Sequence, residues 1–476
     1  MHIKTRLKLL PFVLLVTSSL FGQAQPNISD FTKVIEVLPP SPNAASLGKY
    51  GGIDVGLSSG APNVSVPIYG YKSNNIELPI SLSYSGNGLR VDEIASRVGT
   101  GWNLNAGGVI TRTVFGAIDE ESQRSVPPSN TGSRAYVDFM DNLSSLGAYG
   151  PYDGQPDLFN FNVGGYSGRF ILDSNLTPSL LSYSSVKIEK DFNSTLWNFK
   201  ITTPDGVQYL FGGTGATETT NKNTSGNGCG KSYPNFAPTA WYLNKIAHPN
   251  NDTLTFTYSS VGMHYKTGIS QTIYSPVYNV LGFSDPSYGC TCFDLTSPSL
   301  DNTTCATWLQ TNGALLQEIN STGGAKIKFI YVTRSDFDDR LLSKIEIYQP
   351  NQSTIYKSFE FNYIQSYATG YSNPFTNADA SLNYRPFLSS MTEKSADASL
   401  TKTYNFLYND INARPPRLSY AQDHYGFFNG KNNSTLIPRP ASLMWQQNLP
   451  SATADRETDP VYCAKGMLSK IIYPTG

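Results

Sequence analysis

Charged residues are scarce in this chain of 476 residues: Asp, Glu, Lys and Arg make up 15% of it. An average soluble domain has roughly a quarter. The signs almost cancel, and the formal net charge is -1 at pH 7. Such a balance offers no general field for nucleic acid or for an anionic membrane. The apolar fraction of 39% is enough to bury a core, which excludes wholesale disorder.

Long amphipathic helical patterns are also missing from the sequence. Instead, alternate positions are apolar in several runs, for example at Ile76, Leu78, Ile80, Leu82 and Tyr84. A strict period of two places one face of a strand on a core and the other in water. The sequence therefore predicts an all-β fold of long antiparallel hairpins in stacked or spiralling sheets, with few short helices.

The one strongly apolar run is short and lies at the N-terminus. Lys4, Arg6 and Lys8 precede an apolar stretch over 9–21, and Gly22-Gln23-Ala24 supplies the small residues of a cleavage site. This pattern predicts a signal peptide over 1–24 and a mature chain that is secreted or held at the cell surface. The run is shorter than the ~20 residues that span a bilayer. An uncleaved N-terminal anchor is the alternative, and we expect no transmembrane segment after signal cleavage.

Cysteines are few, and four of the five lie between 229 and 305, at Cys229, Cys290, Cys292 and Cys305. Export favours disulfides, and cross-links in a Gly/Ser/Pro-rich loop near 220–310 would lower its entropy when unfolded. A four-thiolate zinc site is the alternative, but such sites usually leave roughly two to four residues between paired cysteines. The sequence leaves the connectivity open, and the fifth cysteine, Cys463, is expected to be unpaired.

The composition along the chain suggests four segments. After the signal peptide, residues 25–50 are rich in proline and lack periodicity, which predicts an extended lead-in. Strand patterns over 51–190 predict an N-terminal β domain. Residues 191–476 predict a region of repeated β-hairpins, since the same motif recurs there.

Each repeated unit opens at a leucine, turns, and closes at a tyrosine. The units run from Leu243 to Tyr258, from Leu316 to Tyr331 and from Leu342 to Tyr363, and fifteen residues separate the ends of the first two. A looser copy runs over 387–408. Leu468 opens a further unit, so this spacing predicts a closing tyrosine beyond position 476 and a chain cut within a hairpin. Stacked hairpins of this kind bury a continuous face that a single one cannot.

Several motifs together resemble the bacterial RHS/YD-repeat proteins, and in particular the N-terminal region of a large secreted RHS repeat-associated core protein, related to toxin-complex B components. The residues that carry the resemblance include Gly99, Gly101, Trp102, Gly107, Gly108, Arg112, Asp423 and His424. The resemblance implies a β-shell that encloses a C-terminal toxin or cargo polypeptide absent from this chain. It implies as partners the remaining RHS repeat and core polypeptide with that cargo. The core with self-cleavage chemistry is not part of the match.

Motifs for catalysis are lacking, and we expect no enzymatic activity, no cofactor and no bound metal. Asp423 and His424 are neighbours, and adjacent strand residues point to opposite faces, which favours a structural role over acid–base chemistry. Asp336, Asp338 and Asp339 lack the spacing of a calcium loop, so a solvated turn is predicted there.

A carbohydrate-binding or adhesive surface protein is the alternative function. Exposed aromatic rings would stack on sugars, and the candidate rings are those of Trp102, Trp197, Trp241 and Trp308. Core packing of the same side chains is the competing interpretation, and no motif supports a glycan ligand directly. A secreted glycosidase is a third reading, because its two carboxylates need only be close in the fold.

Overall fold

The computed structural model divides the chain into Met1–Ile35 and Glu36–Gly476. All of the residues that it describes belong to the second unit. They are residues 37–38, 40–42, 63–86, 88–116, 118–120, 123–124, 127–144, 152–153, 155–191, 198–224, 232–274, 301–321, 326–350, 353–375, 379–438 and 453–474. The predicted signal peptide lies outside them, so it stays a prediction.

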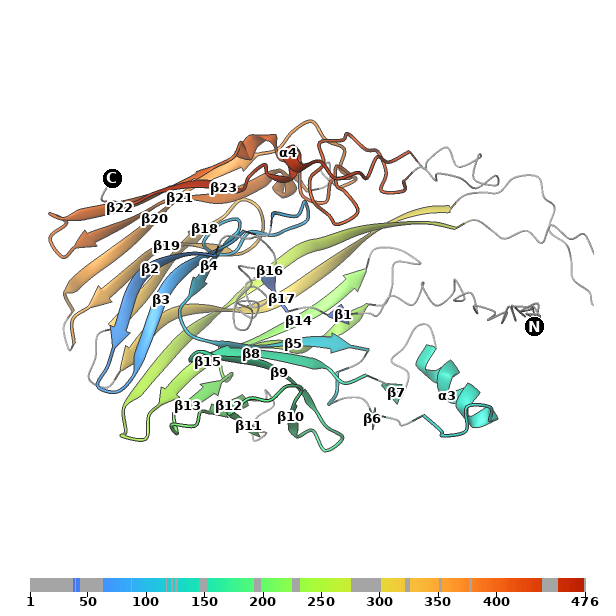
Figure 1. The fold of residues 1–476 in the computed structure, drawn as a ribbon, viewed down its shortest axis with the longest axis horizontal. Helices are drawn as coiled ribbons and strands as arrows, with labels where there is room; N and C mark the ends of the chain where they lie inside the picture. The colour runs from blue at the N-terminus through green and yellow to red at the C-terminus, as the bar shows by residue number, and fades with distance from the viewer. Residues whose placement is uncertain are drawn as a thin grey trace, which may run out of the picture. The chain divides into compact units, whose positions relative to one another are not determined.

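The fold is all-β, as the alternating sequence predicts, and 56% of the described residues lie in strands and 6% in helices. Within the described residues, α3 (Arg134–Ser144) and α4 (Pro460–Cys463) are the α-helices, and η3 (Ala380–Asn383) and η4 (Ile411–Ala413) are short 3-10 turns. None of these helices has the length and hydropathy that a membrane crossing requires. Figure 1 shows the long strands of the unit.

Two small sheets accompany a large one. Strands β2 (Asn63–Lys72), β3 (Glu77–Ser85) and β4 (Trp102–Asn105) form an antiparallel three-stranded sheet. Strands β6 (Gln123–Arg124) and β7 (Tyr152–Asp153) form a short parallel pair.

The first half of the large sheet collects short strands. They are β1 (Val37–Leu38), β5 (Val109–Phe115), β8 (Leu158–Val163), β9 (Tyr166–Leu172), β10 (Pro178–Leu180), β11 (Lys187–Asp191), β12 (Asn198–Thr202), β13 (Gln208–Phe211) and β14 (Thr217–Thr224). β5 is the junction of this half, because it pairs with β1, with β8 and, through residues 109–111, with β15. The strands on either side of residue 190 therefore share one sheet.

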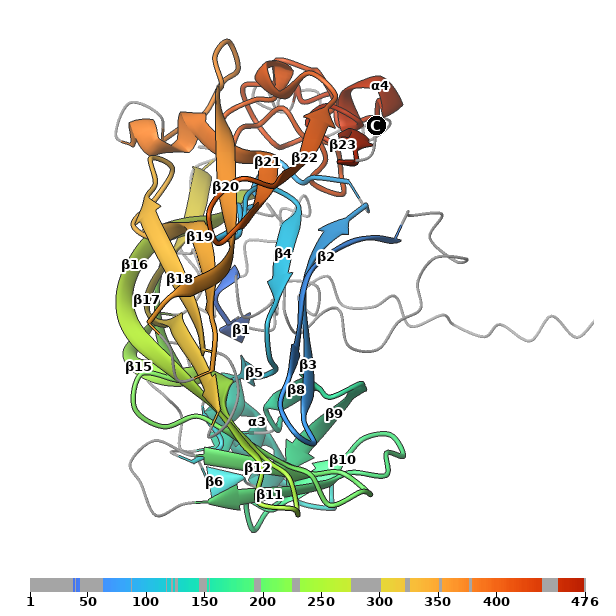
Figure 2. The same ribbon diagram turned by 90° about the vertical axis from the view of Figure 1, so that its left-hand side faces the viewer.

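The second half is a series of antiparallel hairpins. Its strands are β15 (Tyr233–Ala247), β16 (Thr253–Tyr274), β17 (Asp301–Ser321), β18 (Lys326–Thr333), β19 (Arg340–Tyr348), β20 (Ile355–Tyr367), β21 (Tyr384–Ser395), β22 (Thr401–Tyr408) and β23 (Leu468–Ile472). Each strand pairs with the next one along the chain. β16 and β17 are the longest pair, and they bend along their length in Figure 2.

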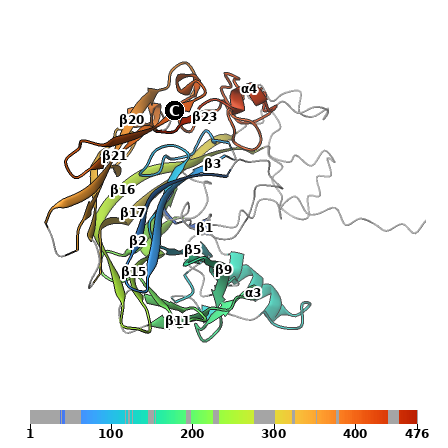
Figure 3. The same cartoon turned by 60° about the vertical axis from the view of Figure 1, so that its left-hand side comes forward.

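The main core lies between the three-stranded sheet and the large sheet. Leu78, Ile80 and Leu82 from alternate positions of β3 share one buried cluster with Leu342 and Phe361 of the hairpin strands. In Figures 2 and 3, the β2–β3 hairpin lies beside the hairpin strands rather than in line with them. The apolar residues that the predicted alternation places on one face of β3 thus form the contact between the two sheets.

Candidate functional site

The repeated tyrosines make the same contact in four units. Each tyrosine hydroxyl donates a hydrogen bond to the carbonyl oxygen of the leucine that opens its own unit. The pairs are Tyr258 to Leu243 (2.8 Å), Tyr331 to Leu316 (2.8 Å), Tyr363 to Leu342 (2.6 Å) and Tyr408 to Leu388 (2.6 Å). We call the four tyrosines, Tyr258, Tyr331, Tyr363 and Tyr408, the tyrosine ladder. The fourth pair belongs to the looser copy in the sequence, which therefore closes like the others.

A β-bulge lies beside every ladder tyrosine. Tyr258 is opposite Leu316, the first residue of the next unit, and the register shifts at Thr257/Tyr258. The same shift occurs before Tyr331, Tyr363 and Tyr408, which lie opposite Leu342, Leu388 and Leu468. A bulge changes the direction in which a side chain points, and it locally interrupts the backbone hydrogen bonds between the two strands. Each tyrosine thereby links the strand it faces to the strand its hydroxyl contacts.

Burial keeps the ladder hydroxyls protonated. It raises the pKa of Tyr258 and of Tyr363 well above the ordinary value for a phenol, and that of Tyr331 and Tyr408 likewise. A neutral hydroxyl can donate a hydrogen bond, which a phenolate cannot. The ladder is therefore suited to structural bonding over the whole physiological pH range.

A segment from the N-terminal half, residues 89–108, crosses these bulges, and we call it the strap. Its Gly108 carbonyl accepts a hydrogen bond from the Leu243 amide (3.0 Å), and its Arg97 carbonyl accepts one from the Leu342 amide (2.8 Å). Just before the strap, the Tyr84 hydroxyl accepts from the Leu468 amide at 2.8 Å. Oxygen atoms of this region thus bind leucine amides at three of the repeated positions.

Four arginines hold the strap by its backbone. Arg414 donates to the carbonyls of residues 89 and 90, and Arg385 to that of residue 91. Arg417 donates to the carbonyl of residue 92, and Arg334 to those of residues 95 and 96. These arginines come from β21 and from the loops after β18 and η4. A guanidinium with five N–H donors in a fixed fork suits neighbouring carbonyl oxygens.

Three of these arginines are buried close to one another. Arg385, Arg414 and Arg417 are at most 2% exposed. Burial, followed by repulsion from the other two, holds the pKa of Arg385 well below its usual range. Asp92 and Glu93 on the strap are the acids that partly offset this effect at Arg385, and burial raises the pKa of Asp92. Burying this much charge costs desolvation free energy. In return, the arginines specify the position in which the strap binds.

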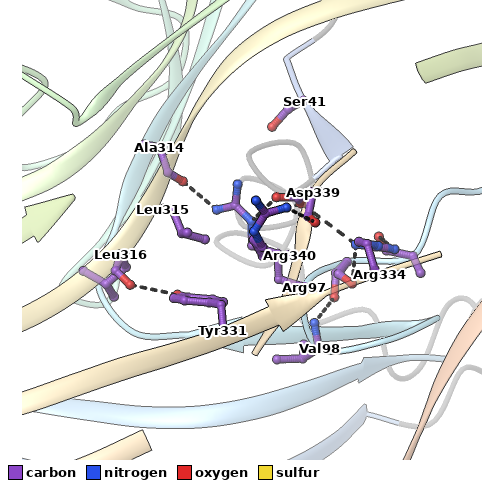
Figure 4. A network of polar contacts seen from close by, with 12 residues as sticks. Ser41, Arg97, Val98, Ala314, Leu315, Leu316, Tyr331, Arg334, Asp339 and Arg340 are labelled. Carbon is purple, nitrogen blue, oxygen red and sulfur yellow. Dashed lines mark hydrogen bonds and ion pairs between the residues drawn. The ribbon is translucent and has the colours of Figure 1, made fainter. Parts of the chain in front are cut away.

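An ion-pair network closes the middle of the strap (Figure 4). The Arg97 Nε contacts both oxygens of Asp339 at 3.1 Å, and its Nη1 donates to the Ala314 carbonyl. Arg334 pairs with Asp336 at 2.6 Å. The predicted solvated turn over these aspartates is therefore wrong for two of them. Asp336 and Asp339 are 1% exposed, because Arg97 from the strap and Arg334 from the loop after β18 neutralise them, whereas Asp338 faces solvent.

Two glycines of the strap are needed for their backbone and their small size. Gly99 has a φ of +100°, and a Cβ there would lie 2.9 Å from the Leu388 amide nitrogen. Gly101 has a φ of +76°, and its Cβ would lie 2.7 Å from the Tyr84 ring. An L-residue would therefore be strained at both positions and would push the strap off the sheet.

The other motif residues of the resemblance also have structural contacts. The Trp102 indole is buried and donates to the ladder hydroxyl of Tyr408 at 2.8 Å. Gly107 and Gly108 lie where the strap enters β5, and a Cβ at Gly108 would meet the Asn162 carbonyl at 2.8 Å.

Arg112 is the centre of a second buried cluster. Its Nε donates to Asp157 at 2.7 Å, its Nη1 donates to Glu120 at 2.8 Å, and its guanidinium lies over the Phe159 ring. The Phe115 amide donates to the other oxygen of Asp157. The ion pair between Arg112 and Asp157 thus ties β5 to the residue just before β8.

Asp423 and His424 do not form a pair. Asp423 is fully buried and accepts hydrogen bonds from the Tyr425 and Phe427 amides and from the Thr458 hydroxyl. His424 is exposed on the surface of the same turn. This carboxylate therefore shapes a loop, and no acid among the described residues pairs with the His424 imidazole.

The cysteine and tryptophan candidates are only partly within the described residues. Cys305 is disulfide-bonded and Cys463 is a free thiol, whereas Cys229, Cys290 and Cys292 lie outside these residues. Trp102 and Trp241 are fully buried, Trp308 is 41% exposed, and Trp197 lies outside as well. Among the described side chains, no group of three or more His, Cys, Asp or Glu residues is placed to hold a metal ion.

The sequence analysis missed the four strap-binding arginines. The motif Arg414-Pro415-Pro416-Arg417 lies in a segment without strand periodicity, and such a segment normally suggests a solvated loop. The sequence did offer one signal: Arg414 and Arg417 flank two prolines in a chain that has few charged residues. The strap carbonyls that accept from Arg414 lie more than 320 residues away along the chain, so no local pattern reveals these contacts.

No family model matches this chain, and no curated protein matches it. Several solved structures are similar to it. The crystal structure of TcdB2-TccC3 without its hypervariable C-terminal region covers 80% of this chain at 11% identity and a TM-score of 0.39. The Photorhabdus luminescens Tc holotoxin pore covers 75% at 10% identity and a TM-score of 0.36.

The N-terminal domain of the effector protein SpvB from Salmonella typhimurium strain LT2 is also similar. It covers 70% of this chain and 99% of its own length, at 10% identity and a TM-score of 0.33. The chain spans 16–17% of the length of the TcdB2-TccC3 chains.

Proposed function

We propose that this chain is a non-enzymatic structural part of a secreted RHS-type protein, and that it forms the start of a β-shell around a toxin or cargo polypeptide. The tyrosine ladder is the observation that carries this proposal. One bond and one bulge recur at a fixed place in four successive units. A sheet built from equal units can be extended by further units, because each one makes the same contacts with its neighbour.

The strap fixes the place where the sheet of repeated hairpins begins. Four arginines and two glycines fasten residues 89–108 to the hairpin strands, so the N-terminal half of the unit is joined to the repeats over a long distance. The three-stranded sheet covers the buried face of the hairpins where the repeats begin. Such an arrangement anchors the first hairpins, and those that follow need only the ladder.

The absence of enzymatic activity is part of the same proposal. The motif residues that carry charge are used in structural contacts: Arg112 binds Asp157, and Asp423 binds backbone amides of its own loop. The partners in this proposal are the remaining RHS polypeptide and the cargo that it encloses.

Protease protection tests the proposal. The native gene would be expressed with all of its downstream coding sequence, and the purified product would be treated with proteinase K before and after denaturation. A segment outside the hairpins should resist cleavage in the intact protein and be degraded once the protein is unfolded. Complete digestion of every such segment in the native product would contradict a shell.

A further inference from the structure

A cavity of about 450 Å³ opens beside β3, and none of the four ladder tyrosines or the four strap-binding arginines lines it. Its volume lies within the range of roughly 300–1,000 Å³ that is usual for small-molecule sites. The cavity is bordered by β3, by the glycine pair at the start of β5, by the β8–β9 turn and by strands β13 and β15. Short segments from distant parts of the chain thus enclose one space.

The cavity has a buried apolar floor and an exposed mouth. Leu78, Val163 and Leu243 supply the floor, each at most 7% exposed. Pro79 and Gly165 lie at the surface. A ligand entering here would therefore rest on aliphatic side chains while one side stayed open to solvent.

Neutral polar groups form the walls of the cavity. Ser81, Asn105, Asn162 and Tyr209 line it and are half-buried. The Asn105 amide nitrogen donates to the hydroxyls of Ser81 and Ser83 at 3.4 and 3.2 Å, which fixes the orientation of its side chain. Burial, more than any neighbouring charge, raises the pKa of Tyr209, so its hydroxyl is neutral.

The Tyr209 hydroxyl is held in place without a hydrogen-bond partner in the described part of the chain. It lies against the β8–β9 turn, where a Cβ on Gly164 would come within 2.5 Å of the hydroxyl oxygen. A half-buried phenol of this kind can both donate and accept a hydrogen bond. A ligand hydroxyl in the cavity would satisfy it.

The charges around the cavity select the class of ligand. Glu77 at the mouth is the only charged side chain among the lining residues that the structure describes, and it pairs with Lys72 at 3.4 Å. Since no lining residue carries a positive charge, an anion would find no counter-charge and would meet a carboxylate. We infer that this cavity binds a neutral saccharide, with its hydroxyls on Tyr209 and the asparagine side chains and its C–H face on the apolar floor.

The test uses the mature chain and a panel of neutral sugars: methyl β-glucoside, methyl β-galactoside, methyl α-mannoside and N-acetylglucosamine. Saturation-transfer NMR and calorimetry should detect binding of at least one of them at millimolar concentration. Tyr209→Phe keeps the ring but removes the hydroxyl, and it should weaken that binding by about 2- to 10-fold. Tyr183→Phe is the matched control, because Tyr183 is 98% exposed and is not one of the lining residues.

Three outcomes would overturn the inference. They are no binding by any sugar of the panel, equal affinity of Tyr209→Phe and the unchanged chain, and tighter binding of glucuronate than of the corresponding neutral glucoside. Thermal melts of both variants separate a lost contact from a lost fold. Because the shell proposal is tested by protease protection, failure of sugar binding leaves that result unaffected.

Discussion

The hydroxyl of Tyr363 lies 2.6 Å from the carbonyl oxygen of Leu342, a residue twenty-one positions earlier in the chain. In the unit before it, Tyr331 makes the same bond to Leu316 across only fifteen positions. The bond is therefore conserved in geometry between units whose turns differ in length. This constancy makes the tyrosine hydroxyl, rather than the turn, the feature that defines a unit.

Removing one ladder hydroxyl should destabilise the protein. Tyr331→Phe leaves the carbonyl of the half-buried Leu316 without this donor, and we expect a loss of about 1–3 kcal/mol in the free energy of unfolding. Urea unfolding of the mature chain measures it. Tyr183→Phe makes the same chemical change at an exposed side chain and should have no measurable effect. Equal stabilities of the two variants would argue against the ladder.

The strap should loosen when an arginine fork is lost. Arg414 donates to the carbonyls of Leu89, Arg90 and Lys465, and a lysine ammonium cannot reproduce this fork. We expect Arg414→Lys to lose about 1–3 kcal/mol of stability and to gain tryptic cleavage at Arg90 under native conditions. Arg134→Lys, at a side chain 83% exposed, is the control. Unchanged proteolysis would contradict the role given to Arg414.

Gly99 should tolerate alanine less well than another glycine with similar backbone geometry. Gly370 has a φ of +88° and nothing within 4 Å of an added Cβ, so Gly370→Ala reports the strain of the backbone alone. Gly99→Ala adds a close contact with the Leu388 amide nitrogen. We expect its loss of stability to exceed that of Gly370→Ala by about 1–3 kcal/mol, as measured by chemical unfolding. Similar losses of stability in the two variants would mean that the strap does not pack closely against the Leu388 amide at Gly99.

Much of the hairpin region could be predicted from the sequence, and little of the strap. Alternating apolar residues specify strands because a period of two is a local property. The spacing from Leu316 to Tyr331 identifies a repeated unit for the same reason. By contrast, Asp336 and Asp339 have an ordinary surface pattern, and only contact with Arg334 and Arg97 makes their burial favourable. Pairings across hundreds of residues leave no local period to detect.

Glu218 should make stability depend on pH. It is fully buried, it accepts hydrogen bonds from the Ser41 amide and hydroxyl, and Arg97, Tyr242 and Tyr265 are titratable groups that interact with it. Burial raises its pKa above the ordinary 4.5. A raised pKa in the folded state means that the folded protein binds the proton more tightly than the unfolded chain does.

The stabilisation from this proton should be complete below pH 4.5 and should decrease as the pH rises through the folded-state pKa. Glu218→Gln removes the titration and should therefore flatten the fall in stability above pH 4.5. Urea unfolding at a series of pH values, compared between the variant and the unchanged chain, measures the difference. Parallel curves would show that Glu218 has an ordinary pKa.

The outer edge of β23 should accept another closing strand. Leu468 occupies the place that Leu316 has in its unit, and its amide is already bound by Tyr84. A copy of residues 325–333 appended after Gly476 would place its tyrosine fifteen positions after Leu468, the spacing of the unit from Leu316 to Tyr331. We expect this extension to raise the urea midpoint, because the new hydroxyl would meet the Leu468 carbonyl.

The matched control for this extension carries phenylalanine in place of the appended tyrosine. It retains the strand and the aromatic ring but cannot donate to the carbonyl, so it should stabilise the chain by about 1 kcal/mol less than the tyrosine version. A scrambled strand of the same composition should add nothing. If all three extensions gave the same midpoint, the ladder would be a consequence of the existing hairpins and not the rule by which further ones are added.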